Sequence, residues 1–99
     1  MATNTELETI SEISLKYPKR YKVLLLNDNY TSMEFVIDIL MRIFHKGYDE
    51  AQNIMLQVHE NGKGVCGVYT HEIAETKIAQ VHQKARDNGF PLRAQMENE

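Results

Sequence analysis

The apolar and polar positions of this chain change their spacing sharply after the first strongly apolar segment. Residues Tyr21–Leu26 form an apolar run that only Lys22 interrupts. A run of this length, bounded by turn-forming residues, predicts a buried strand. It is followed at once by three small polar residues, Asn27, Asp28 and Asn29. The pattern therefore predicts a strand that ends in a loop of hydrogen-bonding side chains, where a scaffold holds polar groups toward solvent.

The segment after this loop has the period of an amphipathic helix. Its larger apolar residues recur at spacings of three and four, at Met33, Val36, Ile37, Leu40, Met41 and Phe44. We expect Thr31 to be the N-cap, with Glu34 as its capping-box partner, and Gly47 to end the helix. The sequence thus places a helix start directly beside the polar loop.

A second helix and a second strand are predicted next. The helix runs from about Asp49 to Asn61-Gly62, and its inward stripe consists of Ala51, Ile54, Met55 and Val58. Residues 62–64 are expected to form a turn before a short strand at Val65–Tyr69. Gly67 in that strand indicates a bulge or a close approach of the backbone.

A third helix and a last strand complete the predicted fold. Thr70 is the expected N-cap, Asn88-Gly89 ends the helix, and the inward stripe is Ala74, Ile78, Val81 and Ala85. Pro91–Ala94 predicts a short edge strand. The predicted order is β-α-α-β-α-β, an α+β fold in which a three-stranded antiparallel sheet packs against three helices.

Length and composition indicate one small domain. We place its core at residues 18–99, because residues 1–17 carry too little apolar surface to fold alone and are expected to form a mobile tail. The net charge of -3 argues against a nucleic-acid partner. No apolar run is long enough to cross a membrane. A single cysteine and the lack of a signal segment lead us to expect a cytoplasmic protein.

The residues that usually carry catalysis or bind metals do not form a recognisable set. Cys66 lies in a predicted strand among apolar residues, which favours a buried structural thiol. None of the four histidines is paired at metal-ligand spacing; they are His45, His59, His71 and His82. Asp28 with His59 would make half of a metal site or an acid–base pair, but no third ligand, nucleophile or phosphate loop completes it. We therefore expect no enzyme activity, no metal and no cofactor.

The polar loop has two interpretations when its residues are taken one by one. Asn27, Asp28 and Asn29 are favourable turn residues, whose side chains bond to nearby backbone. His59 near a helix C-terminus is favoured there by the helix dipole. The same residues, next to the apolar side chains of two helices, would also supply hydrogen-bond acceptors beside an apolar pocket. The individual residues leave both interpretations open.

Three segments together resemble the bacterial ClpS family, the adaptors that recognise N-degrons for the ClpA unfoldase of the ClpAP protease. Residues 21–36 read YKVLLLNDNYTSMEFV, residues 55–59 read MLQVH, and residues 64–77 read GVCGVYTHEIAETK. They occur in the family's order and at its spacing. The resemblance extends from Tyr21 to about Leu92 and implies an adaptor that is not an enzyme.

The resemblance implies a substrate site at the polar loop. Asn27, Asp28 and His59 match the family's contacts to the substrate α-amino group. Six residues match the walls of its side-chain pocket: Thr31, Met33, Val36, Met55, Val58 and Leu92. Met33 matches the gate that disfavours β-branched N-terminal residues, so we expect N-terminal Leu, Phe, Tyr and Trp to be accepted. Binding is expected to weaken in acid, because protonated His59 no longer accepts a hydrogen bond.

The resemblance also implies a protein partner. Glu72 and Lys77 match positions that the family uses to dock the N-terminal domain of the unfoldase, and residues 1–17 match the segment implicated in handing over substrate. We expect a monomer. Two positions depart from the family pattern, which often has Asp where this chain has Asn29 and Pro where it has Ser32. Asn29 removes one negative charge near a cationic ligand.

Two other functions fit parts of the sequence. A β-α-α-β-α-β core of this size also resembles the C-terminal domain of the ribosomal stalk protein, an interaction module that would show no preference for free N-termini. A metal-dependent hydrolase built on Asp28 and His59 would bind a metal but lacks further ligands. Binding of a free N-terminus separates the adaptor from both.

Overall fold

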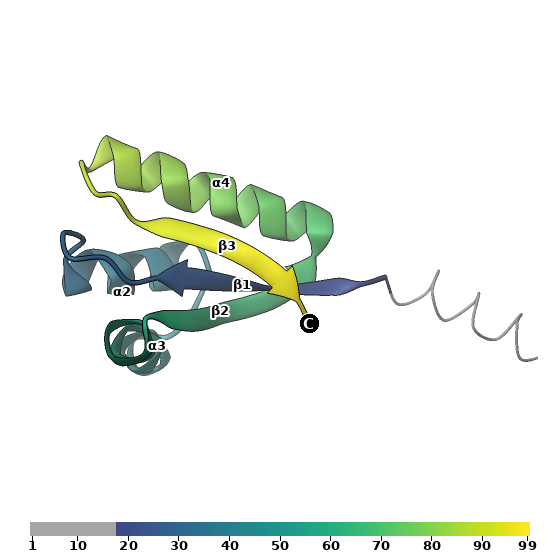
Figure 1. Ribbon diagram of the computed structural model, residues 1–99, viewed down its shortest axis with the longest axis horizontal. Helices are drawn as coiled ribbons and strands as arrows, with labels where there is room; N and C mark the ends of the chain where they lie inside the picture. Colours follow the sequence, from purple (N-terminus) through teal and green to yellow (C-terminus); the bar gives the residue numbers. More distant parts are fainter. Residues whose placement is uncertain (1–17) are drawn as a thin grey trace, which may run out of the picture.

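The predicted element order is confirmed by the structure, a computed structural model that describes residues 18–99 (Figure 1). The predicted tail at residues 1–17 lies outside the described residues. The elements are β1 (Arg20–Leu26), α2 (Met33–Arg42), α3 (Tyr48–Asn61), β2 (Lys63–Thr70), α4 (His71–Asp87) and β3 (Arg93–Asn98). The chain enters β1 at one end of the molecule, and the β1–α2 loop lies at the other end (Figure 1).

The sheet has the order β2-β1-β3, with β1 antiparallel to both neighbours. The apolar run of β1 is buried on both faces, because Val23 and Leu25 are fully buried on one face and Leu24 is buried on the other. The predicted last edge strand is confirmed as β3, but it runs Arg93–Asn98 rather than Pro91–Ala94, so it begins two residues later and extends further. The predicted irregularity at Gly67 is also confirmed, because the pairing passes from Val23 with Gly67 to Leu24 with Val65 and leaves Cys66 as the extra residue of a bulge. A Cβ at Gly67 would collide with the ring of Tyr69.

The core lies between the sheet and the three helices. Val23 and Leu25 of β1 are fully buried there, together with Ile39, Leu40, Ala51, Cys66, Ala74 and Val81. The predicted stripes of the second and third helices are confirmed, although Ile78 is only partly buried. On α2 the buried face is Phe35, Val36, Ile39 and Leu40, so the predicted stripe is wrong for Met33 and Met41, which are exposed.

Leu24 is buried on the opposite face of the sheet, where its exposed fraction is only 3%. Side chains alternate along a strand, so Leu24 points away from the core formed by its neighbours. Lys63 of β2 and Glu97 of β3 lie on the same face, and their ion pair of 3.5 Å spans the central strand. The aliphatic stems of these two residues thereby shield Leu24 from water.

Within residues 18–99, no helix has the length and apolar character needed to span a bilayer.

The start of α2 differs from the prediction by one residue. Ser32, not Thr31, is the N-cap, and its Oγ accepts the N–H of Phe35 at 3.1 Å. The predicted capping box between Thr31 and Glu34 is therefore wrong. The physical reason is competition, because the carboxylate of Asp28 already binds both the N–H and the hydroxyl of Thr31.

The connections after the first two helices also differ from the prediction. Helix α2 ends at Arg42 rather than at Gly47, and the chain turns at His45, whose φ is 56°. Gly47 is instead the N-cap of α3. After α3, the left-handed conformation of Gly62 suffices for the turn, with a φ of 87°, so Lys63 already belongs to β2.

His82 joins α4 to β3 and makes stability sensitive to acid. Its Nε2 accepts the N–H of Ala94 at 3.0 Å. Burial lowers the pKa of His82 below its ordinary value, and the nearby cation of Arg93 lowers it further. The unfolded chain takes up the proton near the ordinary value of about 6.5 while the folded chain resists it. The free energy of unfolding should therefore fall as the pH drops below about 6.5.

Urea denaturation at pH 7.5 and 5.5 measures this effect. We expect the wild-type protein to lose more stability between these two values than His82→Gln, whose amide oxygen accepts a hydrogen bond but takes up no proton. An equal loss in both proteins would show that His82 does not set the acid sensitivity.

Candidate binding site at the end of strand β1

A hollow of about 440 Å³ lies where β1 ends, between the β1–α2 loop, α2 and the end of α3. It is lined by Asn27, Asp28, Asn29, Tyr30, Thr31, Ser32, Met33, Val36, Met55, Val58 and His59. The fold thus brings together all three residues predicted to bind an α-amino group and five of the six predicted pocket walls. Leu92 is not among the lining residues. It is 2% exposed, belongs to the core and faces a separate hollow beside Phe90 and Arg93.

The extension of the sheet places Asn27 and His59 at one edge. The pairing of β1 with β2 ends with Leu26 opposite Lys63, and the N–H of Asn27 then donates to the carbonyl of Gly62 at 2.9 Å. Gly62 follows His59 by three residues and ends α3, where its own N–H donates to the Val58 carbonyl at 3.0 Å. Among residues 18–99, the side chains of Asn27 and His59 find no hydrogen-bond partner, and both are exposed. Their acceptor atoms are therefore available to a ligand.

Asp28 is held by three hydrogen bonds within the loop. Its Oδ1 accepts the N–H of Tyr30 at 2.8 Å and the N–H of Thr31 at 2.6 Å, and its Oδ2 accepts the hydroxyl of Thr31 at 2.7 Å. Partial burial raises the pKa of Asp28, but these hydrogen bonds outweigh it and hold the pKa below its ordinary value. A fixed negative charge therefore lies in the site at neutral pH.

The apolar side of the hollow comes from two helices. Met33 and Val36 project from α2, and Met55 and Val58 project from α3. Three of these side chains are buried, whereas Met33 is 48% exposed and lies free to move at the rim. The site therefore combines acceptors on one side with a wall for an apolar group on the other.

The structure adds three lining residues to which the sequence assigned no specific role in the site: Asn29, which was expected only as part of the polar loop, Tyr30 and Ser32. Tyr30 is 79% exposed, the most exposed large hydrophobic residue among residues 18–99. The signal that would have found all three is their position between Asp28 and Met33, because a short loop whose two ends line a pocket lines it throughout.

The two predicted docking residues have different surroundings on α4. Glu72 is exposed in the first turn. Lys77 is half-buried, its Nζ donates to the carbonyl of Ile43 at 2.7 Å, and it lies 5.8 Å from the ring centre of Phe44 and 5.3 Å from that of Tyr69. Lys77 thus braces α4 against the end of α2, whereas Glu72 is open to a partner.

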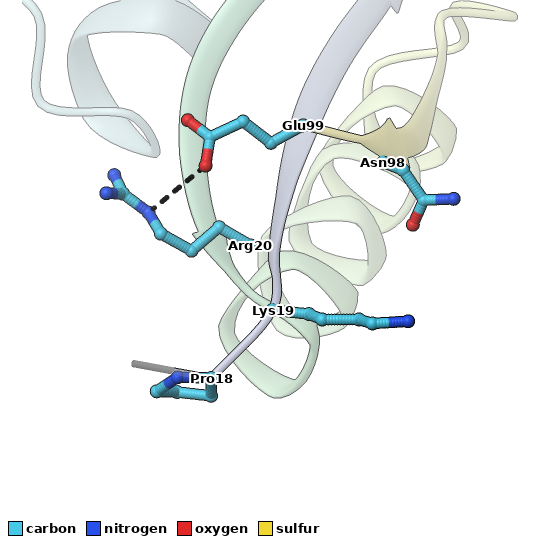
Figure 2. Close-up of a pocket in the computed structure, with 5 residues that line it drawn as sticks. All are labelled: Pro18, Lys19, Arg20, Asn98 and Glu99. Carbon is cyan, nitrogen blue, oxygen red and sulfur yellow. Dashed lines mark ion pairs between the residues drawn. The ribbon is translucent and has the colours of Figure 1, made fainter. Parts of the chain in front are cut away.

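A second hollow of similar volume, about 470 Å³, lies at the opposite end of β1 (Figure 2). It is lined by Pro18, Lys19, Arg20, Asn98 and Glu99, and the Nε of Arg20 lies 3.8 Å from the Oε1 of Glu99. Figure 2 shows Lys19 and Asn98 pointing away from this ion pair. Apart from Pro18 these residues carry polar or charged groups, and none is an aliphatic residue such as those that line the site beside Asp28.

The part of the chain that the structure describes contains no set of ligands for a metal ion. No three His, Cys, Asp or Glu side chains come together there in a way that would hold an ion. Asp28 and His59 therefore have no third His, Cys, Asp or Glu ligand beside them among the described residues. Cys66 is buried, and burial raises the pKa of its thiol to about 12, so it is not a nucleophile at neutral pH.

Comparison with known proteins gives one consistent result. The family described as ATP-dependent Clp protease adaptor protein ClpS matches residues 16–95. The ATP-dependent Clp protease adapter protein ClpS of Oleidesulfovibrio alaskensis is 55% identical over 97 residues, which are 98% of this chain and 93% of the relative. That of Wolinella succinogenes is 53% identical over 92 residues, 93% of this chain and 90% of the relative.

A solved structure is similar along nearly its whole length. It is the structure of Agrobacterium tumefaciens ClpS2 bound to L-phenylalaninamide, with a TM-score of 0.80 and 40% sequence identity. The match covers 83% of this chain and 99% of that chain.

Proposed function

We propose, from the premise that this chain belongs to the ClpS family of ATP-dependent Clp protease adaptors, that it binds proteins by their first residue and delivers them to a ClpA-type unfoldase. The residue it selects has a free α-amino group and a large apolar side chain. One observation carries the proposal: Asn27, Asp28 and His59 share a hollow with the apolar side chains of α2 and α3. The role of the adaptor is binding, without catalysis.

The acceptor cluster is suited to a free amino terminus. An α-ammonium group has three donors, no acceptor and a positive charge. Asn27 supplies an amide oxygen, His59 a ring nitrogen, and Asp28 the negative charge, directly or through a water molecule. An acetylated or internal residue has lost the charge and two donors. The acceptors would then be left desolvated without partners, at about 1–3 kcal/mol for each group.

The apolar wall is suited to the side chain of the first residue. Burying Leu or Phe contributes roughly 1.5–3 kcal/mol, which a polar side chain forfeits. Lost burial alone discriminates poorly between Leu and Ile, so a steric gate is needed. Met33 at the rim is bulky and placed to press on the Cβ of the ligand. L-Phenylalaninamide, bound by the similar protein, combines a free amino group with a benzyl side chain, the two groups that these two sides of the hollow would take.

The surface around Glu72 is the proposed contact with the unfoldase. Glu72 lies beside a shallow hollow that is also lined by Pro18, Lys19, Tyr21, Thr70 and His71. This surface is on the first turn of α4, away from the β1–α2 loop (Figure 1). An adaptor needs two separate surfaces, so that substrate and unfoldase bind together. Lys77 would support the surface by holding α4 in place.

Fluorescence anisotropy with paired peptides tests the proposed function. One labelled peptide begins with a free Leu, and the second is identical but N-acetylated. We expect acetylation to weaken binding by a factor on the order of 100, because the peptide loses its charge and two donors and leaves acceptors of the site unpaired. A peptide beginning with free Asp controls for the apolar wall and should bind weakly. Equal binding of the free and acetylated Leu peptides would contradict the proposal and favour an interaction module without an α-amino site.

A further inference from the structure

We propose that Thr31 is a positioning residue of the α-amino site, and that its hydroxyl rather than its methyl group is what the site requires. The hydroxyl fixes the Asp28 carboxylate in the orientation that meets the incoming ammonium group. This inference rests on the proposed function. It also changes the role expected for Thr31, which the resemblance implies to be a wall of the side-chain pocket.

Asp28 carries the negative charge of the site alone. Among the residues that line the hollow it is the only carboxylate, because the next residue is Asn29. A carboxylate offers about four acceptor positions, and the loop occupies three of those of Asp28. Two bonds fill Oδ1, so the position left for a ligand or a bridging water is on Oδ2. That oxygen is the one held by the Thr31 hydroxyl at 2.7 Å.

Thr31 donates a hydrogen bond to each oxygen of this carboxylate. Its N–H donates to Oδ1 at 2.6 Å, and its hydroxyl donates to Oδ2. The terminal torsion of an aspartate is broad and soft, and its rotation moves both oxygens together, so the two backbone bonds on Oδ1 and the hydroxyl bond on Oδ2 restrain the same rotation. The hydroxyl bond adds a restraint from the opposite side of the carboxylate before the ligand arrives, and a preorganised acceptor binds more tightly than one that must be ordered on binding.

The loop itself does not depend on the hydroxyl. The N–H groups of Tyr30 and Thr31 still donate to Oδ1 when the hydroxyl is absent, and Ser32 caps α2 independently through the N–H of Phe35. Removing the hydroxyl should therefore loosen the orientation of the Asp28 carboxylate as a whole and leave the backbone of the site in place. This separates positioning from folding.

Two substitutions at Thr31 give opposite results under the two roles. Thr31→Val keeps the shape and the methyl group but loses the hydroxyl, whereas Thr31→Ser keeps the hydroxyl and loses the methyl. For positioning, we expect Thr31→Val to weaken binding of a free-Leu peptide by about 5- to 20-fold, roughly 1–1.8 kcal/mol, because the carboxylate that meets the ammonium group is less well ordered. Thr31→Ser should rescue binding to within about threefold, about 0.65 kcal/mol. For a pocket wall, the order reverses.

Thr76→Val is the matched control. It removes a threonine hydroxyl that also makes one hydrogen bond, to the Glu72 carbonyl at 3.1 Å, but on exposed α4. It should bind the peptide as the wild type does. A readout specific to positioning is the pKa of Asp28, followed by carbon NMR of its carboxyl group. It should rise in Thr31→Val, remain low in Thr31→Ser and be unchanged in the control.

The outcomes are distinguishable from failure of the proposed function. If the wild type binds the free peptide and Thr31→Val binds equally well, the positioning role is overturned and the adaptor function stands. If the wild type does not distinguish free from acetylated peptides, the proposed function itself falls. Thermal unfolding checks each variant. Should Thr31→Val fail to fold, Thr31→Ala against Thr31→Ser provides the same contrast, and equal weakening in both would overturn the inference.

Discussion

Replacing Asp28 with alanine is expected to weaken binding of a free-Leu peptide by about 100-fold or more, the largest loss from any single side chain of the site. Two effects add. The ammonium group loses its only negative partner, and a charge-assisted hydrogen bond contributes about 1.5–3 kcal/mol. The N–H groups of Tyr30 and Thr31 also lose their acceptor, so the loop that carries Asn27 loosens. Titration of the labelled peptide by anisotropy measures the sum.

Asp28→Asn separates these two effects. The asparagine oxygen still accepts the N–H groups of Tyr30 and Thr31, so the loop keeps its shape while the charge is gone. We expect a loss between that of alanine and the wild type, together with a weaker dependence of affinity on salt. Equal losses in Asp28→Asn and Asp28→Ala would assign the whole effect to charge. A loss below threefold in Asp28→Ala would contradict the role of Asp28 in the site.

The two variants should also differ from the wild type in acid stability. The folded pKa of Asp28 lies below its ordinary value, so the carboxylate stabilises the folded chain above about pH 4, and this contribution is lost as the pH falls through the folded pKa. Neither variant has this contribution to lose. The loss of stability caused by protonation of Asp28 therefore occurs at a lower pH than the loss caused by His82, so a pH series of unfolding measurements distinguishes the two effects.

The sequence predicts the elements of this fold better than their junctions. Short apolar runs bounded by turn residues identify the strands and helical period identifies the helices, because burial imposes such a pattern on each segment separately. The junctions depend on competition among polar groups. Asp28 takes the N–H and hydroxyl of Thr31, which moves the start of α2 to Ser32. The chain turns after α2 at a non-glycine residue with positive φ, His45, rather than at Gly47, where the helix was expected to end. No propensity of a single residue decides such cases.

The site could be predicted only in part for a related reason. Asn27 and His59 are ordinary turn and helix-end residues when taken alone, and they meet because β2 pairs beside β1 and extends to the Gly62 carbonyl. That register is a property of the whole sheet. The resemblance supplied the grouping that the residues alone left open. Leu92, which packs in the core, and Lys77, which bonds to the Ile43 carbonyl, show surroundings that no motif encodes.

Lys77 illustrates what this implies for experiments on the docking surface. Truncation of its side chain would remove a hydrogen bond to the end of α2 and two contacts with aromatic rings, besides any contact with the unfoldase. A loss of delivery in such a variant would mix stability with docking. Glu72 is exposed, and no hydrogen bond or ion pair of its side chain is present within residues 18–99. It is therefore the residue at which docking can be tested cleanly.

Gly64→Ala is expected to damage both stability and peptide binding, because β2 passes closest to α3 at this position. A Cβ on Gly64 would lie 2.9 Å from the Cγ2 of Val58 and 3.2 Å from the Ile54 carbonyl oxygen. The strand pairs with Leu25 at the centre of the sheet and cannot move away freely. Overpacking of this kind costs about 1–3 kcal/mol. Urea denaturation should show a reduction of that size.

The same substitution should reach the site through Val58. This side chain is a wall of the hollow and directly precedes His59, so displacing the end of α3 shifts both the apolar wall and one acceptor. We expect affinity for the free-Leu peptide to fall by about tenfold, equivalent to about 1.4 kcal/mol. Loss of stability with unchanged affinity would show instead that β2 moves away from α3 while Val58 stays in place, and that the site does not depend on this contact.

Two other glycines provide controls for the cause. Gly62→Ala has open space around the added Cβ but a φ of 87°, so it tests backbone strain alone, at about 1–2 kcal/mol. Gly47→Ala has open space and a φ of -68°, so neither cause applies. Affinity should stay unchanged in Gly47→Ala. In Gly62→Ala we expect a loss of stability that is larger than any loss of affinity, although the carbonyl of residue 62 accepts the N–H of Asn27. Only Gly64→Ala adds atoms against the pocket wall, so weaker binding at equal stability loss would identify the close packing of β2 on α3 as the support of the site.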